Sequence, residues 1–244
     1  MSETSRSKRA RLDRFISQQT GIARKDVRPL VARGRIAVDG QPARAINQVI
    51  EQFTHVSLDG RILQGATPIY LMMNKPRGVV SATQDEQHRT VIELLGEEYP
   101  GDLHIAGRLD LNSTGLLLLT NDGRWSRWLS SPEQRIAKRY RVTLARPLTP
   151  EYIEAFAQGM YFSYEGITTR PAGLKILSEF EAEVELTEGR YHQIKRMFGR
   201  FRNPVLTLHR VAIGELELDE TLAPGQSRAL SSQELAQFAC PQDG

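Results

Sequence analysis

An arginine and an aspartate stand two residues apart beside the most apolar run of the chain, in Gly107-Arg108-Leu109-Asp110. In an extended backbone, residues i and i+2 point to the same face, so Arg108 and Asp110 are expected to lie side by side. Two interpretations stay open from this spacing. One is a structural ion pair at the surface. The other is an aspartate that the guanidinium keeps ionised and orients, available as a nucleophile or a base at neutral pH.

A second group of candidates lies in Glu188-Gly189-Arg190-Tyr191-His192-Gln193-Ile194-Lys195-Arg196-Met197-Phe198, which is typical of a turn that opens a helix. His192 precedes Lys195 by three residues and Arg196 by four, so the three side chains are expected to share one helix face. The spacing alone leaves two readings of this basic face, a solvated surface or part of a site.

Two further segments contain candidates whose residue types say less. The stretch Lys138–Leu144 alternates as a strand does, which puts Tyr140 on one face with Lys138 and Val142. A tyrosine there is by default a core aromatic whose hydroxyl finds a partner. The apolar run 69–74 is stopped by Lys75-Pro76-Arg77-Gly78, which by itself indicates a core strand and a turn.

These side chains must be positioned by strands and helices in mixed order. Leu116–Leu119 is typical of a strand buried on both faces, and Asn121-Asp122-Gly123 is the turn expected to end it. Other strands are expected at 69–74, 138–144 and 182–186, and helices at 90–95, 124–129 and 150–159. Trp125 and Trp128 are expected in the core rather than as base-stacking residues. The last helix is expected to turn Tyr152, Ile153 and Phe156 inward.

Positive charge is concentrated in the first part of the chain. Between Arg6 and Arg44 eleven Lys or Arg face three Asp, whereas the whole chain carries a net charge of only +3. Helices are expected at 11–19 and 24–32, the second with Pro29 inside, so that it either kinks or begins later. Short strands are expected at 36–38 and around Asp59-Gly60. The patterns predict a basic tail at 1–9, a nucleic-acid-binding module at 10–62, a linker at 63–68 and a second domain at 69–240.

Several function classes have no support in the composition. The single cysteine, Cys240, allows no disulfide within the chain, and the five histidines show no metal-ligand spacing, so we expect no metal. A GxGxxG or P-loop pattern is missing, which argues against a nucleotide cofactor. No run approaches the roughly 20 apolar residues of a membrane span, and the N-terminus lacks the features of a secretory signal. We expect a cytoplasmic protein without membrane contact.

Four motifs in order resemble the RsuA-type family of ribosomal RNA pseudouridine synthases. They are Asn74-Lys75-Pro76-Arg77-Gly78, Gly107-Arg108-Leu109-Asp110 with Ser113–Gly123, Lys138-Arg139-Tyr140, and Glu188–Met197. Residues 10–60, above all Leu30–Gly40, resemble the S4 RNA-binding domain. The resemblance implies an α+β fold. A small N-terminal S4-like domain would be joined to a catalytic domain built on a mixed, mostly antiparallel sheet flanked by helices.

The resemblance also implies roles for individual residues. Asp110 would be catalytic, with Arg108 as its ion-pair partner, Tyr140 against the target base and Lys195 near the carboxylate. The reaction needs no redox step, and we expect no cofactor. RNA contacts are expected from a larger set of basic residues: Arg11, Arg14, Arg24, Lys25, Arg28, Arg33, Arg35, Lys75, Arg190, His192 and Arg196. The partner would be ribosomal RNA or a ribosomal-subunit assembly intermediate, and the protein a monomer.

Three segments resemble in sequence the branch of this family that modifies small-subunit (16S) ribosomal RNA: Asp122–Ser126, Ser131-Pro132 and Leu222–Gly225. A large-subunit (23S) target is the alternative within the family. A non-catalytic RNA-binding or ribosome-assembly protein with an inactive synthase fold is a second alternative. A nucleoside hydrolase-like enzyme is a third, against which the basic module favours a polymer substrate. Whether Asp110 acts as a nucleophile or a base stays open.

Overall fold

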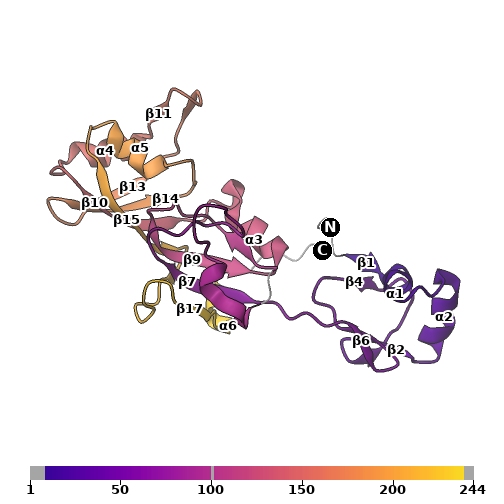
Figure 1. Ribbon diagram of the computed structural model, residues 1–244. Helices are drawn as coiled ribbons and strands as arrows, with labels where there is room; N and C mark the ends of the chain where they lie inside the picture. Colours follow the sequence, from indigo (N-terminus) through magenta and orange to yellow (C-terminus); the bar gives the residue numbers. More distant parts are fainter. Residues whose placement is uncertain (1–8, 100–101, 239–244) are drawn as a thin grey trace. The chain divides into compact units, whose positions relative to one another are not determined.

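A computed structural model of the chain describes residues 9–99 and 102–238. The chain divides into two compact units between Pro68 and Ile69, each of which is described by itself (Figure 1). Most of the expected basic tail and Cys240 lie outside the described residues.

The first unit packs two short helices against small antiparallel sheets. Helix α1 (Leu12–Thr20) buries Leu12, Phe15 and Ile16, as its spacing predicts. Helix α2 (Arg24–Ala32) begins where expected and contains Pro29, so the alternative of a later start is wrong. Strand order is β3-β2-β5-β6 in the main sheet, with β1 paired to β4. The strands are β1 (Ala10–Arg11), β2 (Ile36–Val38), β3 (Gln41–Pro42), β4 (Val49–Ile50), β5 (Val56–Leu58) and β6 (Arg61–Gln64).

Strand β6 continues to Gln64, two residues into the segment expected as a linker. Its register opposite β5 pairs Leu58 with Arg61 across the Asp59-Gly60 turn. Hydrogen bonding to β5 therefore extends regular structure slightly further than the composition of the segment suggests.

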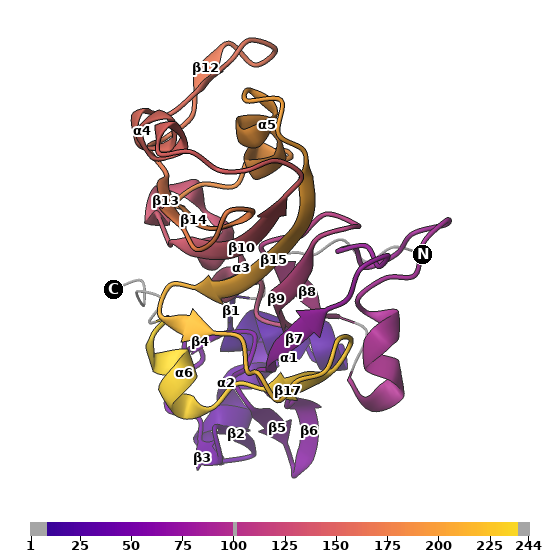
Figure 2. The same cartoon turned by 90° about the vertical axis from the view of Figure 1, so that its left-hand side faces the viewer.

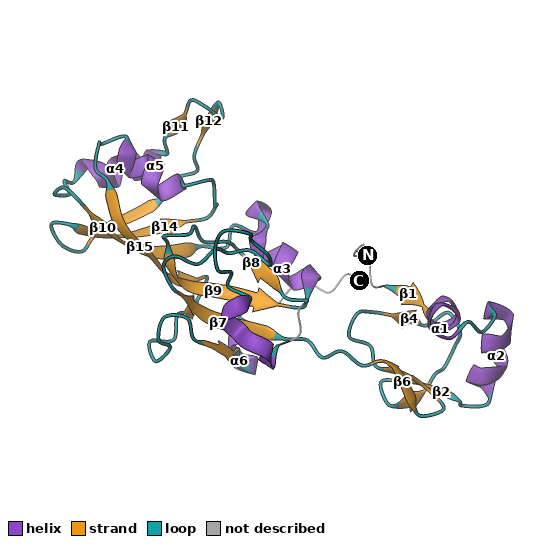
Figure 3. Cartoon of the chain, viewed as in Figure 1, coloured by secondary structure: helices purple, strands orange, loops and turns teal. Residues whose placement is uncertain are grey.

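The second unit is built on a nine-stranded sheet (Figure 3). Seven of its strands follow the order β13-β14-β10-β15-β9-β7-β17, while β16 pairs with β15 and β8 pairs with β9. Only β9 and β15 run parallel among the pairs in this sheet, which confirms a mixed, mostly antiparallel arrangement. The strands are β7 (Tyr70–Lys75), β8 (His104–Ala106), β9 (Thr114–Thr120), β10 (Lys138–Leu144), β13 (Gly173–Ile176), β14 (Glu181–Leu186), β15 (Val205–Ile213), β16 (Leu216–Glu217) and β17 (Ser227–Ala229).

Helices cover both faces of this sheet, and a separate hairpin stands beside one of them. Helices α4 and α5 and the hairpin lie at the end of the sheet formed by β13, β14 and β10 (Figure 2). Helices α3 and α6 pack on the other face, where Trp125 and Leu129 join the core. The elements are η1 (Glu93–Glu98), α3 (Gly123–Ser130), η2 (Pro132–Gln134), α4 (Glu151–Gln158), α5 (Gln193–Gly199), α6 (Ser232–Ala236), and the hairpin strands β11 (Tyr161–Phe162) and β12 (Ile167–Thr168).

Strand β9 is the centre of the unit because it contributes to both cores. Leu117 and Leu119 join the core on one face, and Leu116 and Leu118 join the core on the other. All four leucines are fully buried, which confirms the two-sided burial expected of an uninterrupted apolar run. Trp125 is buried and Trp128 packs against the same core, as predicted.

Two local expectations need correction, and the expected turn after β9 has a second role. Ile153 on α4 is 42% exposed, because only Tyr152 and Phe156 turn toward the sheet. The helix expected at 90–95 is a 3₁₀ helix over Glu93–Glu98, and the Thr90 hydroxyl, three residues before it, accepts the Glu93 N–H at 3.2 Å. The turn after β9 is also a helix start, since Asp122 accepts the backbone N–H groups of the first turn of α3.

Within residues 9–99 and 102–238, no helix has the length and apolar character that a bilayer crossing requires.

Candidate active site

Asp110 lies in the loop between β8 and β9, and this loop is not a strand. The backbone leaves the sheet after Ala106, Gly107 adopts φ +81°, and the Ser113 N–H turns back to the Asp110 carbonyl at 3.0 Å. The i, i+2 argument for Arg108 and Asp110 therefore does not apply. Among the described residues the ion pairs of Asp110 go elsewhere, so the expected pair with Arg108 is wrong. Arg108 is exposed, and it lines the same pocket as Asp110.

The carboxylate of Asp110 meets a lysine and a histidine from the start of helix α5. Lys195 Nζ donates to Oδ2 at 2.9 Å, and His192 Nε2 lies 3.4 Å from the same oxygen. His192 is the residue before the helix and holds a left-handed backbone with φ +49°. The three side chains are each about one-third exposed, so the group faces solvent without being surrounded by it.

Arg196 does not join this group, although its spacing predicts that it shares a face with His192 and Lys195. Both of its terminal nitrogens donate to the carboxylate of Glu165, in the turn of the β11–β12 hairpin. Its guanidinium also lies 3.8 Å from the centre of the Phe162 ring. The hairpin carboxylate and the ring draw Arg196 away from Asp110, which no local pattern indicates.

A pocket of about 90 Å³ opens beside the Asp110 carboxylate. Tyr140, at 8% exposure, forms part of its wall from strand β10. Apolar contacts come from Leu109, Leu186, Ile194 and Leu208, and the polar lining includes Arg108, Ser113, Arg190 and Gln193. The volume is far below the roughly 300 Å³ of a cleft for a drug-sized ligand, so the pocket has room for a single small ring. The structure thus brings Asp110, Tyr140, His192 and Lys195 together.

Lys75 supports the Asp110 loop from inside the protein. It is fully buried, and its ammonium donates to the carbonyls of Ser113 at 2.8 Å, Pro76 at 3.0 Å and Leu111 at 3.4 Å. Burial lowers the pKa of Lys75 to about 8, against the opposing influence of the Asp110 charge. The expected RNA contact of Lys75 is therefore wrong, because its donors are turned inward and water does not reach them.

Arg210 on strand β15 holds the same loop at its two ends. This guanidinium is 1% exposed and donates to the Gly107 carbonyl at 2.8 Å and to the Leu116 carbonyl at 2.7 Å. Gly115 permits the close approach of β9 and β15, since a Cβ there would lie 2.3 Å from the Arg210 carbonyl oxygen. Sequence reasoning missed both the burial of Lys75 and the role of Arg210.

The chain that forms this site is similar in sequence to known proteins. Residues 69–199 match the model of the family described as RNA pseudouridylate synthase. The chain is 47% identical over 226 residues to the ribosomal small subunit pseudouridine synthase A of Pseudomonas aeruginosa, covering 92% of this chain and 98% of that protein. It is 41% identical over 227 residues to the protein of the same name from Escherichia coli, covering 93% and 98%.

A solved structure described as a pseudouridylate synthase superposes with a TM-score of 0.69 at 36% identity, covering 94% of this chain and 99% of the other. The chain belongs to the RNA pseudouridylate synthase family. The family resemblance expected from its motifs is thereby confirmed, and so is an isomerase of the pseudouridine synthase class.

In this pseudouridine synthase the turn before α5 is fixed by a buried carboxylate. Glu188 is 5% exposed and accepts from Gln193 Nε2 at 2.8 Å, the Arg170 N–H at 2.9 Å and Arg190 Nε at 3.0 Å. Arg190 is thus held at the rim of the pocket rather than free to reach outward. These contacts fix the backbone of the turn that leads to the left-handed residue His192, whose ring lies beside the Asp110 carboxylate.

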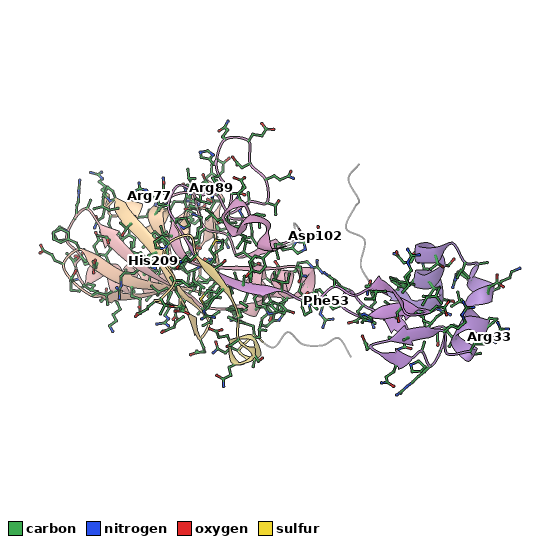
Figure 4. All side chains as sticks on the ribbon, turned by 60° about the horizontal axis from the view of Figure 1, so that its bottom comes forward. Arg33, Phe53, Arg77, Arg89, Asp102 and His209 are labelled. Carbon is green, nitrogen blue, oxygen red and sulfur yellow. The ribbon has the colours of Figure 1, made fainter. Side chains whose placement is uncertain are left out.

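The basic residues of the synthase's first unit fall into two groups. Arg11 and Arg24 both bind the buried Asp13 carboxylate, at 3.1 and 2.9 Å, and Arg35 binds Asp59. The second group is exposed and has no ion pair among the described residues: Arg14, Lys25, Arg28, Arg33, Arg44 and Arg61. Arg33 is labelled in Figure 4. A groove of about 470 Å³ is lined by Arg11, Arg28 and the previously unassigned Arg44, together with the 45–47 segment.

Proposed function

We propose that this synthase converts a specific uridine of small-subunit (16S) ribosomal RNA to pseudouridine, with Asp110 as the catalytic residue. The observation that carries the proposal is the Asp110 carboxylate, held by Lys195 and His192 at the mouth of a ring-sized pocket beside Tyr140. Relatives at 41–47% identity, aligned over nearly their whole length, are named for the ribosomal small subunit. The names of these relatives support small-subunit RNA as the target, and the geometry around Asp110 supports the isomerisation of uridine.

The reaction is an isomerisation, so its atoms balance without a co-reactant. The bond from uracil N1 to ribose C1′ breaks, the base turns, and a bond from C5 to C1′ forms. N1 gains a proton and C5 loses one. Asp110 serves this step either as a nucleophile at C1′ or as a base, in the way that glycosidase carboxylates act at an anomeric carbon. Lys195 stabilises the carboxylate as an anion and fixes its direction.

The pocket accommodates the base once the uridine has left its stack. Flipping a nucleotide costs a few kcal/mol, which stacking and polar contacts in the pocket offset. Tyr140 provides the apolar surface for the base, and Arg108, exposed at the rim, is placed to contact a phosphate. No redox cofactor is needed for any of these steps.

The first unit is proposed to be an S4-like module that binds RNA through its phosphates. Support comes from its six exposed cations that have no ion pair among the described residues, and from the groove lined by Arg11, Arg28 and Arg44. Lys and Arg contacts to phosphate give affinity and position without reading sequence. The same proposal includes ribosomal RNA or a subunit assembly intermediate as the partner, a cytoplasmic location and a monomeric enzyme.

Mapping of pseudouridine in both ribosomal RNAs tests the proposal. The purified enzyme is incubated with unmodified small-subunit and large-subunit RNA, and new pseudouridines are located by sequencing. We expect one site in the small-subunit RNA and none with Asp110→Asn, whose turnover should fall by at least about 10³-fold. RNA binding of Asp110→Asn should stay near that of the wild type. A new pseudouridine only in large-subunit RNA would show that this RNA, and not small-subunit RNA, is the substrate. RNA binding without any new pseudouridine would favour a role in ribosome assembly.

A further inference from the structure

Tyr191 is exposed in a way that an aromatic side chain beside a catalytic group rarely is. Tyr191 is 75% exposed, yet its ring stacks on the ring of His192, with the ring centroids 3.9 Å apart and the planes at 19°. The stack covers one face of the tyrosine ring and leaves most of the rest to solvent. Hydrophobic burial therefore does not explain its position.

The stack ends at the catalytic carboxylate. His192 Nε2 lies 3.4 Å from Asp110 Oδ2, so the tyrosine ring is one stacking layer beyond the residue that touches Asp110. The proposed uridine occupies the pocket that His192 and Tyr140 both line. Tyr191 is not among the lining residues, but its ring stacks on His192, which is one of them.

The backbone beneath Tyr191 is held firmly although the ring is exposed. The Gln193 side chain accepts the Arg190 N–H at 3.1 Å and itself donates to the buried Glu188. On the other side, Arg196 donates to the Tyr191 carbonyl at 3.4 Å while its guanidinium is fixed by Glu165 of the hairpin. An aromatic ring on such a fixed turn presents a flat surface with little conformational freedom to lose on binding.

We propose that Tyr191 stacks on the base of a nucleotide next to the target uridine, and so forms a second base site outside the pocket. The inference rests on the proposed function, since it takes the flipped uridine as given. When that uridine leaves the helix, its neighbour loses a stacking partner, and an exposed aromatic ring can replace it. Every base has a π-face, so the site would bind a flanking nucleotide with little sequence preference. Arg108, which is exposed at the rim of the pocket, supplies positive charge for its phosphates.

A kinetic cycle separates this role from mere support of His192. One RNA substrate carries the target uridine between normal bases. The others carry an abasic residue next to that uridine, either on its 5′ side or on its 3′ side. For the wild type, the abasic residue on one side should raise KM about tenfold at nearly constant kcat, because stacking of one base on an aromatic ring is lost. Tyr191→Leu should show that higher KM already with the normal RNA, and no further increase with the abasic RNA.

Two further variants serve as controls. Tyr191→Phe retains the ring and should behave as the wild type. Tyr164→Leu removes a tyrosine that is 95% exposed in the turn of the β11–β12 hairpin and takes part in none of the ring stacks of the described residues. This variant should retain the full sensitivity to the abasic residue. Equal sensitivity of Tyr191→Leu and the wild type overturns the proposal, and so does a fall in kcat alone, which would indicate that Tyr191 only orients His192.

A binding measurement makes the test independent of turnover. Single-stranded ribosomal RNA fragments carry the fluorescent base 2-aminopurine beside a uridine, and stacking on an aromatic ring quenches its emission. Binding to Asp110→Asn should quench the probe, and binding to the Asp110→Asn, Tyr191→Leu double variant should not. If no uridine in either ribosomal RNA is converted, the proposed function fails while this quench still decides the role of Tyr191. Equal quenching in both proteins overturns the second base site.

Discussion

Lys195 Nζ lies 2.9 Å from Asp110 Oδ2, although 85 residues separate the two in the chain. Lys195 comes from the first turn of α5 and Asp110 from the loop between β8 and β9. Removing the ammonium should leave the carboxylate without its strongest partner. We expect Lys195→Met to lower kcat about 100-fold, in the range seen when a charge-stabilising donor is lost from an active site.

RNA binding by Lys195→Met should change little, because the exposed cations that meet phosphates are retained. Lys195→Arg keeps a charged donor and should recover part of the activity. Lys175→Met, on the exposed edge strand β13, is the matched control and should leave kcat unchanged. Single-turnover assays with a ribosomal RNA fragment give kcat, and a filter-binding titration gives the affinity. A Lys195→Met enzyme of normal rate would contradict this role.

The pH dependence of stability should report the buried lysine. Burial lowers the pKa of Lys75 to about 8 in the folded protein, from about 10.5 in the unfolded chain. Between these values the unfolded state binds more protons, so the free energy of unfolding should rise with pH from about 8 to about 10.5, by at most about 1.4 kcal/mol per pH unit per lysine. Below pH 8 the cost of the buried charge is fully present.

Lys138 shares this behaviour, since burial also lowers its pKa to about 8. The variant Lys75→Met should therefore show a shallower rise above pH 8 than the wild type, but not a flat one. It should also lose about 1–3 kcal/mol at pH 7, because carbonyls of the Asp110 loop lose a buried donor. Urea unfolding between pH 7 and pH 10 measures both effects. An unchanged slope in Lys75→Met would show that Lys75 does not titrate in this window.

Gly115 should be intolerant of any side chain. It holds φ +101°, and a Cβ would lie 2.3 Å from the Arg210 carbonyl oxygen, which belongs to the backbone and cannot turn aside. We expect Gly115→Ala to destabilise the second unit by at least about 3 kcal/mol, through strain and separation of β9 from β15. Gly199→Ala is the control, since it meets no atom within 4 Å. Thermal unfolding followed by circular dichroism compares the two, and similar midpoints would refute the argument.

The salt dependence of RNA binding should depend on the first unit. Each phosphate contact contributes about 0.7–0.9 to the slope of log K against log salt. Arg28→Gln with Arg33→Gln should therefore reduce the slope by about 1.5 while kcat at saturating RNA stays near normal. Titrations at several salt concentrations measure the slope. Lys175→Gln should leave it unchanged, and an unaltered slope in the double variant would remove these two arginines from the RNA contact.

Local patterns were sufficient for much of the fold. The uninterrupted leucines of β9 indicated burial on both faces, and the alternation of 138–144 predicted the bounds of β10. The helix of 150–159 was predicted, but the orientation of Ile153 was not, because a short amphipathic pattern does not say how wide the buried stripe is. The helix expected at 90–95 begins only at Glu93, and the non-helical backbone of Gly96 interrupts it.

The sequence by itself determined which carboxylate to consider, because Asp110 stands in a motif with few polar alternatives beside a buried strand. It also determined that positive charge gathers before residue 45. Only the tertiary structure decided what holds the Asp110 carboxylate. The sheet register and the packing of α5 bring Lys195 and His192 to it, whereas the neighbouring Arg108 turns to the pocket rim. The same packing buries Lys75 and Arg210 under the loop. Contacts across 85 residues depend on how separate elements pack, and residue spacing within one element carries no information about that.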